Sequence, residues 1–345
     1  MSDVLLRELT NPDLDWLVNV GKHDAIAPQQ VMLCPTDPWD NVYVLVDGEV
    51  CLFRKKEDAR PLTGIDRGEV FGESPLFDLP CPGTLKTVKP SQVISIPREV
   101  LTQKLHADVA FAAHFYRAIA VMLSERLRNL FEMTNQLQMG RASAAKEALS
   151  IFGELRDSDV DWLTSTGKIE KVAANQVLLQ AGRPIDGLYM VLDGRFSIAV
   201  PDGAFSPLAM CMAKLEERSR SYRLIAEISK GGFPGIVAFL DSRPMPVTIR
   251  SVTEALIFTV PRPAMVVKLQ TDLGFAARLY RVMAVQISEL LQAVLDQISG
   301  SAIAPLRSSD GEAMEDDELD LDDLQQMSEG AARFNWMLDQ LGLAS

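Results

Sequence analysis

The residue types that carry most protein chemistry are sparse and scattered in this sequence. Its four cysteines show no CxxC spacing, and its three histidines lie far apart. A metal site needs several such ligands at characteristic spacings, so none is predicted. The GxSxG, GxxxxGK[ST] and HExxH motifs are also absent from the sequence. We therefore predict a non-enzymatic protein, without catalytic or metal-binding residues, whose cysteines are free thiols in a reducing compartment.

An internal repeat organises the chain. DLDWL at 13–17 recurs as DVDWL 146 residues later, and YVLVDG at 43–48 recurs as YMVLDG at the same offset. IPR at 96–98 recurs as VPR 164 residues later, so the second copy contains an insertion, mostly near residues 206–223. Many matches in one order over more than a hundred residues indicate a tandem duplication.

Each copy shows the same order of expected elements. A short helix near residues 13–20 precedes short strands, of which 42–46 is rich in β-branched residues and ends in Asp47-Gly48, a hairpin-type turn. Amphipathic patterns at about 107–137 and 272–298 predict a long helix at the end of each copy. The fold class expected is α+β: two tandem antiparallel β jelly-roll barrels, each with flanking helices and a long C-terminal helix.

The domains expected are 1–138, the first copy, and 152–299, the second copy. Residues 139–151 form either a flexible linker or a continuation of the first long helix, because Ala, Arg and Lys favour helix. Residues 300–345 are expected to form an acidic, flexible tail with a short terminal amphipathic helix.

The second long helix carries an apolar stripe at three- and four-residue steps. Its members are Met283, Ile287, Leu290, Val294 and Ile298. The stripe either packs on its own barrel or forms a helix-to-helix homodimer seam.

The acidic charge of the chain is concentrated in the tail. Residues 306–345 contain eleven acidic and two basic residues, a net charge of −9 out of −13 for the whole chain. Near the end, Phe334, Trp336, Leu338 and Leu341 are apolar residues of one short segment, which either docks into a groove on a partner protein or packs back on its own domains. The negative balance argues against DNA binding, which relies on Lys and Arg.

Three segments of the first copy carry a family signature: Asp47-Gly48, Gly68-Glu69-Val70-Phe71-Gly72-Glu73 and Ile96-Pro97-Arg98. With the element order, they resemble the cyclic-nucleotide-binding domain of catabolite-activator-type regulators and protein-kinase-A regulatory subunits, over roughly residues 8–135 and 152–298. The resemblance implies that Phe71, Gly72 and Glu73 open a phosphate-binding cassette. In this cassette the Gly lets the backbone approach the ligand, and the Glu accepts a hydrogen bond from a ribose hydroxyl. A short helix then donates its N-terminal backbone amides to the phosphate.

The family's cassette also carries an Arg that neutralises the phosphate, followed by a Ser or Thr. Aligned on Thr84, the first copy has Cys81 in place of that Arg. The second copy, aligned on Thr248, has Met245 there, and it reads FPG at 233–235, without the Glu. A hydrogen bond to a charged group contributes about 1.5–3 kcal/mol, so binding of cAMP or cGMP is expected to be weak.

Three cations could replace the missing Arg. Lys86 and Arg250 lie two residues beyond the two threonines, and Arg243 lies five residues before Thr248. Each of them either contacts a ligand or is an exposed, solubilising charge. Glu73 in turn is either the ribose acceptor or a structural carboxylate that caps nearby amides.

The sequence favours a regulatory protein that senses cAMP, cGMP or another small ligand in its first copy. The alternative is a degenerate pseudo-receptor adaptor that binds a protein through its barrels and acidic tail. An activator-type relative would carry a DNA-binding helix-turn-helix after the long helix, where this chain is acidic, so no DNA partner is expected. No apolar run reaches the length of a membrane span and the N-terminus does not resemble a signal peptide, which predicts a cytoplasmic protein without a membrane partner.

Overall fold

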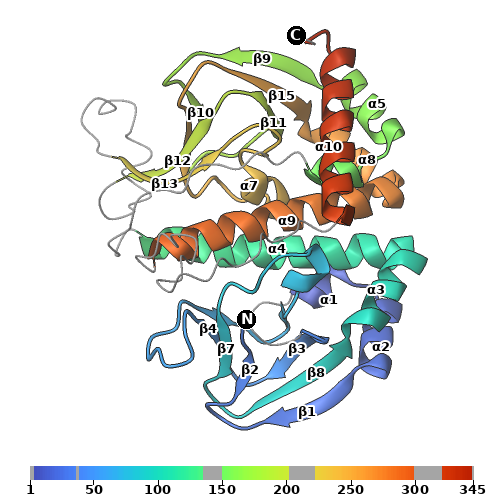
Figure 1. Cartoon of the computed structure of the whole chain (residues 1–345), viewed down its shortest axis with the longest axis vertical. Coiled ribbons are helices and arrows are strands. Elements are labelled where there is room, and N and C mark those ends of the chain that lie inside the picture. The colour runs from blue at the N-terminus through green and yellow to red at the C-terminus, as the bar shows by residue number, and fades with distance from the viewer. Residues whose placement is uncertain (1–3, 36–38, 135–149, 202–221, 299–320, 344–345) are drawn as a thin grey trace. The chain divides into compact units, whose positions relative to one another are not determined.

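The computed structural model describes residues 4–35, 39–134, 150–201, 222–298 and 321–343. The first copy runs from two short helices through eight strands to a pair of helices (Figure 1). Its elements are α1 Val4–Glu8, α2 Asn11–Val20, β1 Lys22–Ile26, β2 Val31–Leu33, β3 Asn41–Asp47, β4 Val50–Phe53, β5 Thr63–Ile65, β6 Val70–Phe71, the 3-10 helix η1 Ser74–Phe77, β7 Thr84–Thr87, β8 Ser91–Pro97, α3 Arg98–Ala107 and α4 Val109–Thr134.

The second copy follows a similar order, without a strand in the place of β6, and is followed by one more helix. Its elements are the 3-10 helix η2 Ser150–Glu154, α5 Asp157–Thr166, β9 Lys168–Val172, β10 Val177–Leu179, β11 Gly187–Asp193, β12 Phe196–Pro201, β13 Tyr222–Ile228, α7 Ile236–Asp241, β14 Thr248–Ser251, β15 Ala255–Pro261, α8 Arg262–Thr271, α9 Leu273–Ile298 and α10 Leu321–Gln340. Of the linker predicted at 139–151, residues 139–149 lie outside the described residues, as does the acidic run up to residue 320, and residues 150–151 belong to η2.

Each copy contains two antiparallel sheets. The first copy has sheets in the order β1-β8-β3-β6 and β2-β7-β4-β5, and the second has β11-β15-β9 and β10-β14-β12-β13. Strands at matching places in the repeat therefore pair in the same way, for example β3 with β8 and β11 with β15. This is the tandem jelly-roll architecture predicted from the repeat.

The turn at Asp47-Gly48 differs from the prediction. Gly48 has a φ of +103°, and a Cβ there would lie 2.4 Å from the Ser91 hydroxyl oxygen, so only glycine fits. However, β3 and β4 on either side of the turn belong to different sheets. The turn is a corner between two sheets and not a hairpin, a distinction that the short-range pattern does not contain.

The long helix of each copy begins at an aspartate. The Asp108 carboxylate accepts from the backbone N–H of Phe111 at 3.1 Å, and that of Asp272 accepts from Phe275 at 2.9 Å. The first long helix, predicted from residue 107, therefore starts at Val109, after a break that separates it from α3. Both α4 and α9 are 26 residues long.

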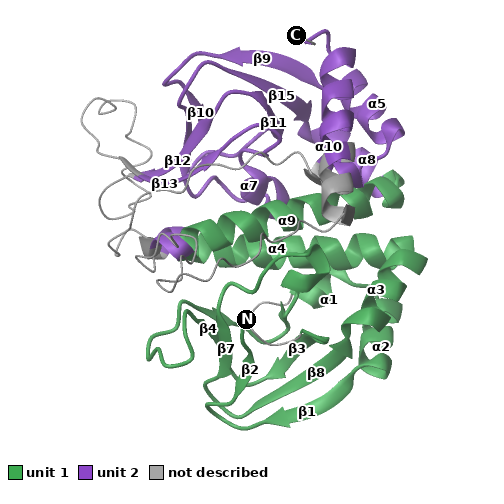
Figure 2. Cartoon of the chain, in the orientation of Figure 1, with its two compact units in different colours: residues 1–130, 271–295 green, residues 131–270, 296–345 purple. Residues whose placement is uncertain are grey.

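The described chain divides into two compact units, and the division does not follow the repeat. Unit 1 comprises residues 1–130 and 271–295, and unit 2 comprises 131–270 and 296–345 (Figure 2). Most of α9 thus belongs to unit 1, where it lies beside α4 and places Arg117 6.0 Å from the ring of Tyr280. Its stripe residues Met283, Ile287 and Val294 are fully buried. These three side chains are therefore covered by the chain itself, and homodimer formation through the stripe remains a prediction.

The end of the tail forms a 20-residue helix, α10, that packs on η2 and α5 of unit 2. Phe334 is fully buried and meets Phe152 edge-on, with ring centroids 4.8 Å apart. Arg333 donates through Nη1 to the backbone carbonyl of Gly153 at 2.5 Å. Of the two alternatives for this segment, the structure shows packing on the chain itself.

Replacing Phe334 with Ala is expected to destabilise unit 2 by about 3–5 kcal/mol, because a fully buried aromatic side chain is removed and leaves a cavity. Chemical denaturation of the purified variant measures the effect. The matched control is Asn335→Ala, an exposed neighbour on the same helix, which should change the free energy of unfolding by less than about 0.5 kcal/mol. Equal, small effects of both variants would contradict the packing of α10.

A capping box fixes the start of α2 in unit 1. The Thr10 hydroxyl accepts from the Asp13 backbone N–H, and the Asp13 carboxylate accepts from the Thr10 N–H at 2.9 Å. The same carboxylate contacts Nδ1 of His114 on α4 at 2.9 Å. Burial acts to raise the pKa of Asp13, but the hydrogen bonds from Thr10 and the contact with His114 outweigh it, so the pKa is lowered.

Asp13→Asn should lower the free energy of unfolding by about 1 kcal/mol at pH 7, the usual size of a lost cap. The folded state lowers the pKa of Asp13, so its stabilisation is present above the unfolded value of about 4 and is lost as the pH falls through the folded value. Urea denaturation of both proteins at pH 7 and pH 3 should show the difference shrinking. The exposed Asp15→Asn on the same helix is the control, and a difference that grows at low pH would contradict the assignment.

Candidate functional site

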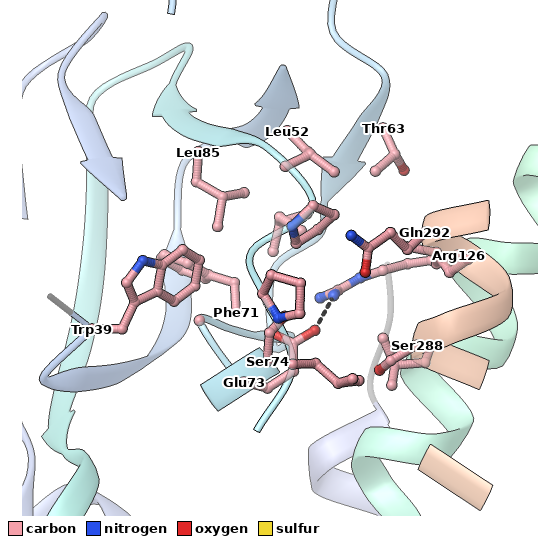
Figure 3. A pocket seen from close by; sticks show the side chains of 17 residues that line it. Trp39, Leu52, Thr63, Phe71, Glu73, Ser74, Leu85, Arg126, Ser288 and Gln292 are labelled. Carbon is pink, nitrogen blue, oxygen red and sulfur yellow. Dashed lines mark hydrogen bonds and ion pairs between the residues drawn. The ribbon is translucent and has the colours of Figure 1, made fainter. Parts of the chain in front are cut away.

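Unit 1 contains a recess between the cassette, residues 71–84, and the helices α4 and α9 (Figure 3). The space between these elements, counted together with its open mouth, is about 570 Å³. The residues that line it are Trp39, Leu52, Thr63, Ile65, Phe71, Gly72, Glu73, Ser74, Leu79, Pro80, Pro82, Leu85, Leu123, Arg126, Ser288, Leu291 and Gln292. Its wall is mainly apolar, with a few polar groups.

The cassette begins with a glycine in the left-handed region. Gly72 has a φ of +78°, and a Cβ there would meet Leu33 at 3.1 Å and the Asn41 carbonyl oxygen at 3.3 Å. This turn directs Glu73 into the interior of unit 1, where it precedes η1 and is only 7% exposed. The sequence-predicted residues Phe71, Gly72 and Glu73 therefore all line the recess.

A buried ion cluster forms the polar end of the recess. Arg126 of α4 donates through Nη1 to Oε1 of Glu73 at 2.8 Å. Its Nε and Nη2 donate to Oε2 of Glu69 at 3.3 and 3.2 Å, and Nη2 also donates to the carbonyl oxygen of Val70 at 2.5 Å. Figure 3 shows the Arg126 and Glu73 side chains facing each other at the wall. The cluster ties the cassette to the long helix.

Burial dominates the electrostatics of this cluster. It raises the pKa of Glu69, although Arg126 acts in the opposite direction. Burial by itself disfavours the charged guanidinium, but the carboxylates of Glu73 and Glu69 more than offset it, and the pKa of Arg126 is raised. Arg126 is therefore permanently charged and held by two acidic partners.

Sequence reasoning missed three of the polar groups at this site. Arg126 occurs on the apolar face of α4 near Leu123 and Leu127, so an isolated charge within an apolar stripe was the available signal. Ser288 and Gln292 lie on α9, which the sequence assigns to the second copy. No local pattern indicates that they line a recess beside the first cassette.

Thr84 and Cys81 lie in the cassette but do not line the recess. The Thr84 hydroxyl is buried, 3.9 Å from the Cys34 sulfur. The Cys81 thiol donates to the carbonyl oxygen of Gly83 at 2.7 Å, and burial raises its pKa to about 12. Cys81 is therefore uncharged at neutral pH, where the family resemblance places a cation.

Lys86 is occupied away from the recess. Its Nζ donates to the backbone carbonyls of Lys56 and Asp58 at 3.0 and 3.2 Å and lies 3.9 Å from the centre of the Phe53 ring. The Lys86 side chain is buried, so the alternative of an exposed, solubilising charge is wrong, and ligand contact by Lys86 remains a prediction. It holds the loop that connects β4 and β5.

The candidate residues of the second copy have other partners. Arg243 pairs with Asp241 through Nε at 2.9 Å and is half exposed. Arg250 donates to the carbonyl oxygen of Asn175 at 2.6 Å. The Thr248 hydroxyl accepts from the backbone N–H of Ala181 at 3.3 Å. The described contacts do not bring these three side chains together.

The structure also shifts the alignment of the two cassettes by one residue. Gly235 has a φ of +81°, and a Cβ there would meet Leu179, the counterpart of Leu33, so Gly235 corresponds to Gly72. Comparing FPG at 233–235 directly with Phe71-Gly72-Glu73 pairs Gly235 with Glu73 instead. The true counterpart of Glu73 is Ile236, which is buried. The second cassette therefore still lacks the carboxylate.

The remaining positions of the cluster are also uncharged in the second copy. Gly232 exchanges backbone hydrogen bonds with Ser229 and Val191 as Glu69 does with Asp66 and Leu45, so it is the counterpart of Glu69. At the offset of 164, Leu290 corresponds to Arg126. The ion cluster is thus a property of the first copy.

Membrane-spanning helices and clusters of metal ligands are both absent from the described residues. No helix in that part of the chain is both long and apolar enough to cross a membrane. Nor do three or more His, Cys, Asp or Glu side chains gather there in a way that could hold a metal ion.

A family model described as the cyclic nucleotide-binding domain matches residues 24–108 and 169–272, together more than half of the chain. The chain therefore belongs to the cyclic nucleotide-binding domain family, with two tandem domains of this regulatory, ligand-binding type. No curated protein matches the chain in sequence.

Several solved structures share 14–16% identity with the chain. The regulatory domain of Toxoplasma gondii PKA with cAMP has a TM-score of 0.29, covering 79% of this chain and 89% of that one. The regulatory subunit of a cAMP-independent protein kinase A from Trypanosoma brucei has a TM-score of 0.27, covering 78% and 87%. The Thermus thermophilus catabolite activator protein has a TM-score of 0.32, covering 41% and 59%.

Replacing Arg126 with Met should destabilise unit 1 by about 3–5 kcal/mol, because Glu69 and Glu73 are left buried without their counter-charge. Urea denaturation at neutral pH measures the loss. Arg117→Met on the same helix is the matched control: Arg117 pairs with Glu8 at 3.0 Å but is 49% exposed, so it should cost less than about 1 kcal/mol. Equal costs at the two positions would contradict a buried, closed cluster.

Proposed function

We propose that the chain is a non-enzymatic regulatory protein that senses a small ligand in the recess of its first copy. The observation that supports this most directly is the ion pair between Glu73 and Arg126. It joins the cassette that lines the recess to the long helix α4. A ligand that donates a hydrogen bond to the Glu73 carboxylate alters one of the groups that hold α4. Ligand occupancy of the recess and the position of α4 are therefore coupled.

The second copy serves a different purpose in this proposal. Its counterparts of Glu69, Glu73 and Arg126 are Gly232, Ile236 and Leu290, none of which can pair with a polar ligand or with one another. We propose that the second copy is a structural domain and that ligand binding belongs to the first.

Cyclic nucleotides are the ligands that the family name suggests, and the recess fits them only in part. Glu73 is available at its edge, but Cys81 is neutral and Lys86 is bound to backbone carbonyls. The charge-assisted hydrogen bond to a phosphate is worth about 1.5–3 kcal/mol, so without it the affinity is reduced by about ten- to a hundredfold.

The adaptor hypothesis remains a prediction. Phe334 belongs to the core of unit 2, so a protein partner would have to contact the half-buried Trp336, Leu338 and Leu341. The acidic run before α10 lies outside the described residues. The observations on the recess favour the sensor, and we place the adaptor second.

Thermal unfolding against a panel of cAMP, cGMP, adenosine and guanosine at about millimolar concentration tests the proposal. A ligand at about a hundred times its dissociation constant should stabilise the protein by about 2.7 kcal/mol. Glu73→Gln should abolish the ligand-induced shift. Glu49→Gln is the control, since Glu49 pairs with Lys89 at the surface and does not line the recess; this variant should keep the shift. The absence of a shift with every ligand would contradict a sensor of this kind.

A further inference from the structure

The buried ion cluster at the recess contains more negative than positive groups. Arg126 is the single cation among the described residues that line it, and it faces two carboxylates, Glu73 at the wall and Glu69 behind it. All three groups are more than nine-tenths buried. With the three groups ionised, the cluster carries one net negative charge in a poorly solvated place, where charge interactions are strong.

Arg126 has little capacity to bind an added anion. Its Nε, Nη1 and Nη2 all donate to groups of the protein, namely the two carboxylates and the carbonyl oxygen of Val70. A phosphate that drew the guanidinium away would leave Glu69 and Glu73 buried without a counter-charge, which is the most unfavourable way to break such a cluster.

Among the described residues of and next to the cassette, Lys86 and Cys81 do not supply a second cation. Lys86 is held by the carbonyls of Lys56 and Asp58. Cys81 is a neutral thiol whose pKa the negative charge of Glu73 also helps to raise, after burial. A phosphate in the recess would therefore add negative charge to a site that is already negative.

The same wall suits an uncharged ligand with hydroxyl groups and a flat ring. Arg126 contacts Oε1 of Glu73, so within the described contacts Oε2 remains to accept a hydrogen bond. Ser288 and Gln292 of α9 add a hydroxyl and an amide to the lining of the recess (Figure 3). Trp39 and Phe71 supply aromatic surface, against which a heterocyclic ring can pack.

We infer that the first-copy recess selects an uncharged ligand of the nucleoside class over the corresponding cyclic nucleotide. This inference rests on the proposed function, because it names the ligand class of the same recess. The discrimination arises from charge: the nucleoside retains the ring and the hydroxyl donors and omits the phosphate that the cluster repels.

Isothermal titration of the full chain with two matched pairs tests the inference: adenosine with cAMP, and guanosine with cGMP. In at least one pair, the nucleoside should bind at least tenfold more tightly than its cyclic nucleotide. If ligands bind but neither pair shows a tenfold preference for the nucleoside, the inference is overturned and the sensor proposal stands. If all four fail to bind at millimolar concentration, the sensor proposal falls, and the inference falls with it.

A charge variant shows whether the cluster is the cause. Glu69→Gln brings the cluster to zero net charge without changing its shape, so the nucleoside preference should narrow by at least tenfold. Glu49→Gln removes one negative charge from the same chain at a surface ion pair and should leave the preference within about twofold of its original value. An unchanged preference in Glu69→Gln, with the variant shown to be folded by circular dichroism, would overturn the electrostatic explanation.

Discussion

Arg126 extends from α4 to the carboxylates of Glu69 and Glu73, and much of the first copy is arranged around these contacts. Burying three charges is costly, and it is tolerated only where each charge has close partners. Here the guanidinium satisfies both carboxylates and the Val70 carbonyl within 3.3 Å. The left-handed turn at Gly72 is what brings Glu73 inward to meet it. The interaction thus fixes the cassette, the strand β6 and the long helix relative to one another.

The second copy shows what the fold needs when this interaction is absent. It retains the pairing of the other strands without a counterpart of β6, and it keeps the left-handed glycine and the aspartate at the start of its long helix. At the three cluster positions it has Gly232, Ile236 and Leu290, so apolar packing and backbone hydrogen bonds are sufficient there. Because the second copy forms the same architecture without these charges, the jelly-roll fold itself does not require them.

The two ends of the second copy are used in different ways. Most of α9 belongs to unit 1, where Ser288, Leu291 and Gln292 line the recess. The helix α10 belongs to unit 2, where Phe334 packs on Phe152. An apolar helix face that the sequence pattern suggests for partner binding can therefore be covered by the chain itself. The sequence pattern is the same whether a partner protein or the same chain covers the face.

The sequence alone determined the duplication, the order of elements, the jelly-roll class and three residues of the recess, because these depend on local signals: strand alternation, turn glycines and the GEVFGE segment. It also predicts that neither cassette carries the family's arginine, with Cys81 and Met245 at the aligned positions. Tertiary structure decided the rest. Arg126 is 53 residues from Glu73, and the side chains of α9 come from the other copy, so no periodicity or spacing relates them. Similarly, Lys86 is adjacent to the cassette in sequence yet is held by a different loop. Long-range packing decides which charged residues lie at the same recess, and local sequence patterns do not predict this.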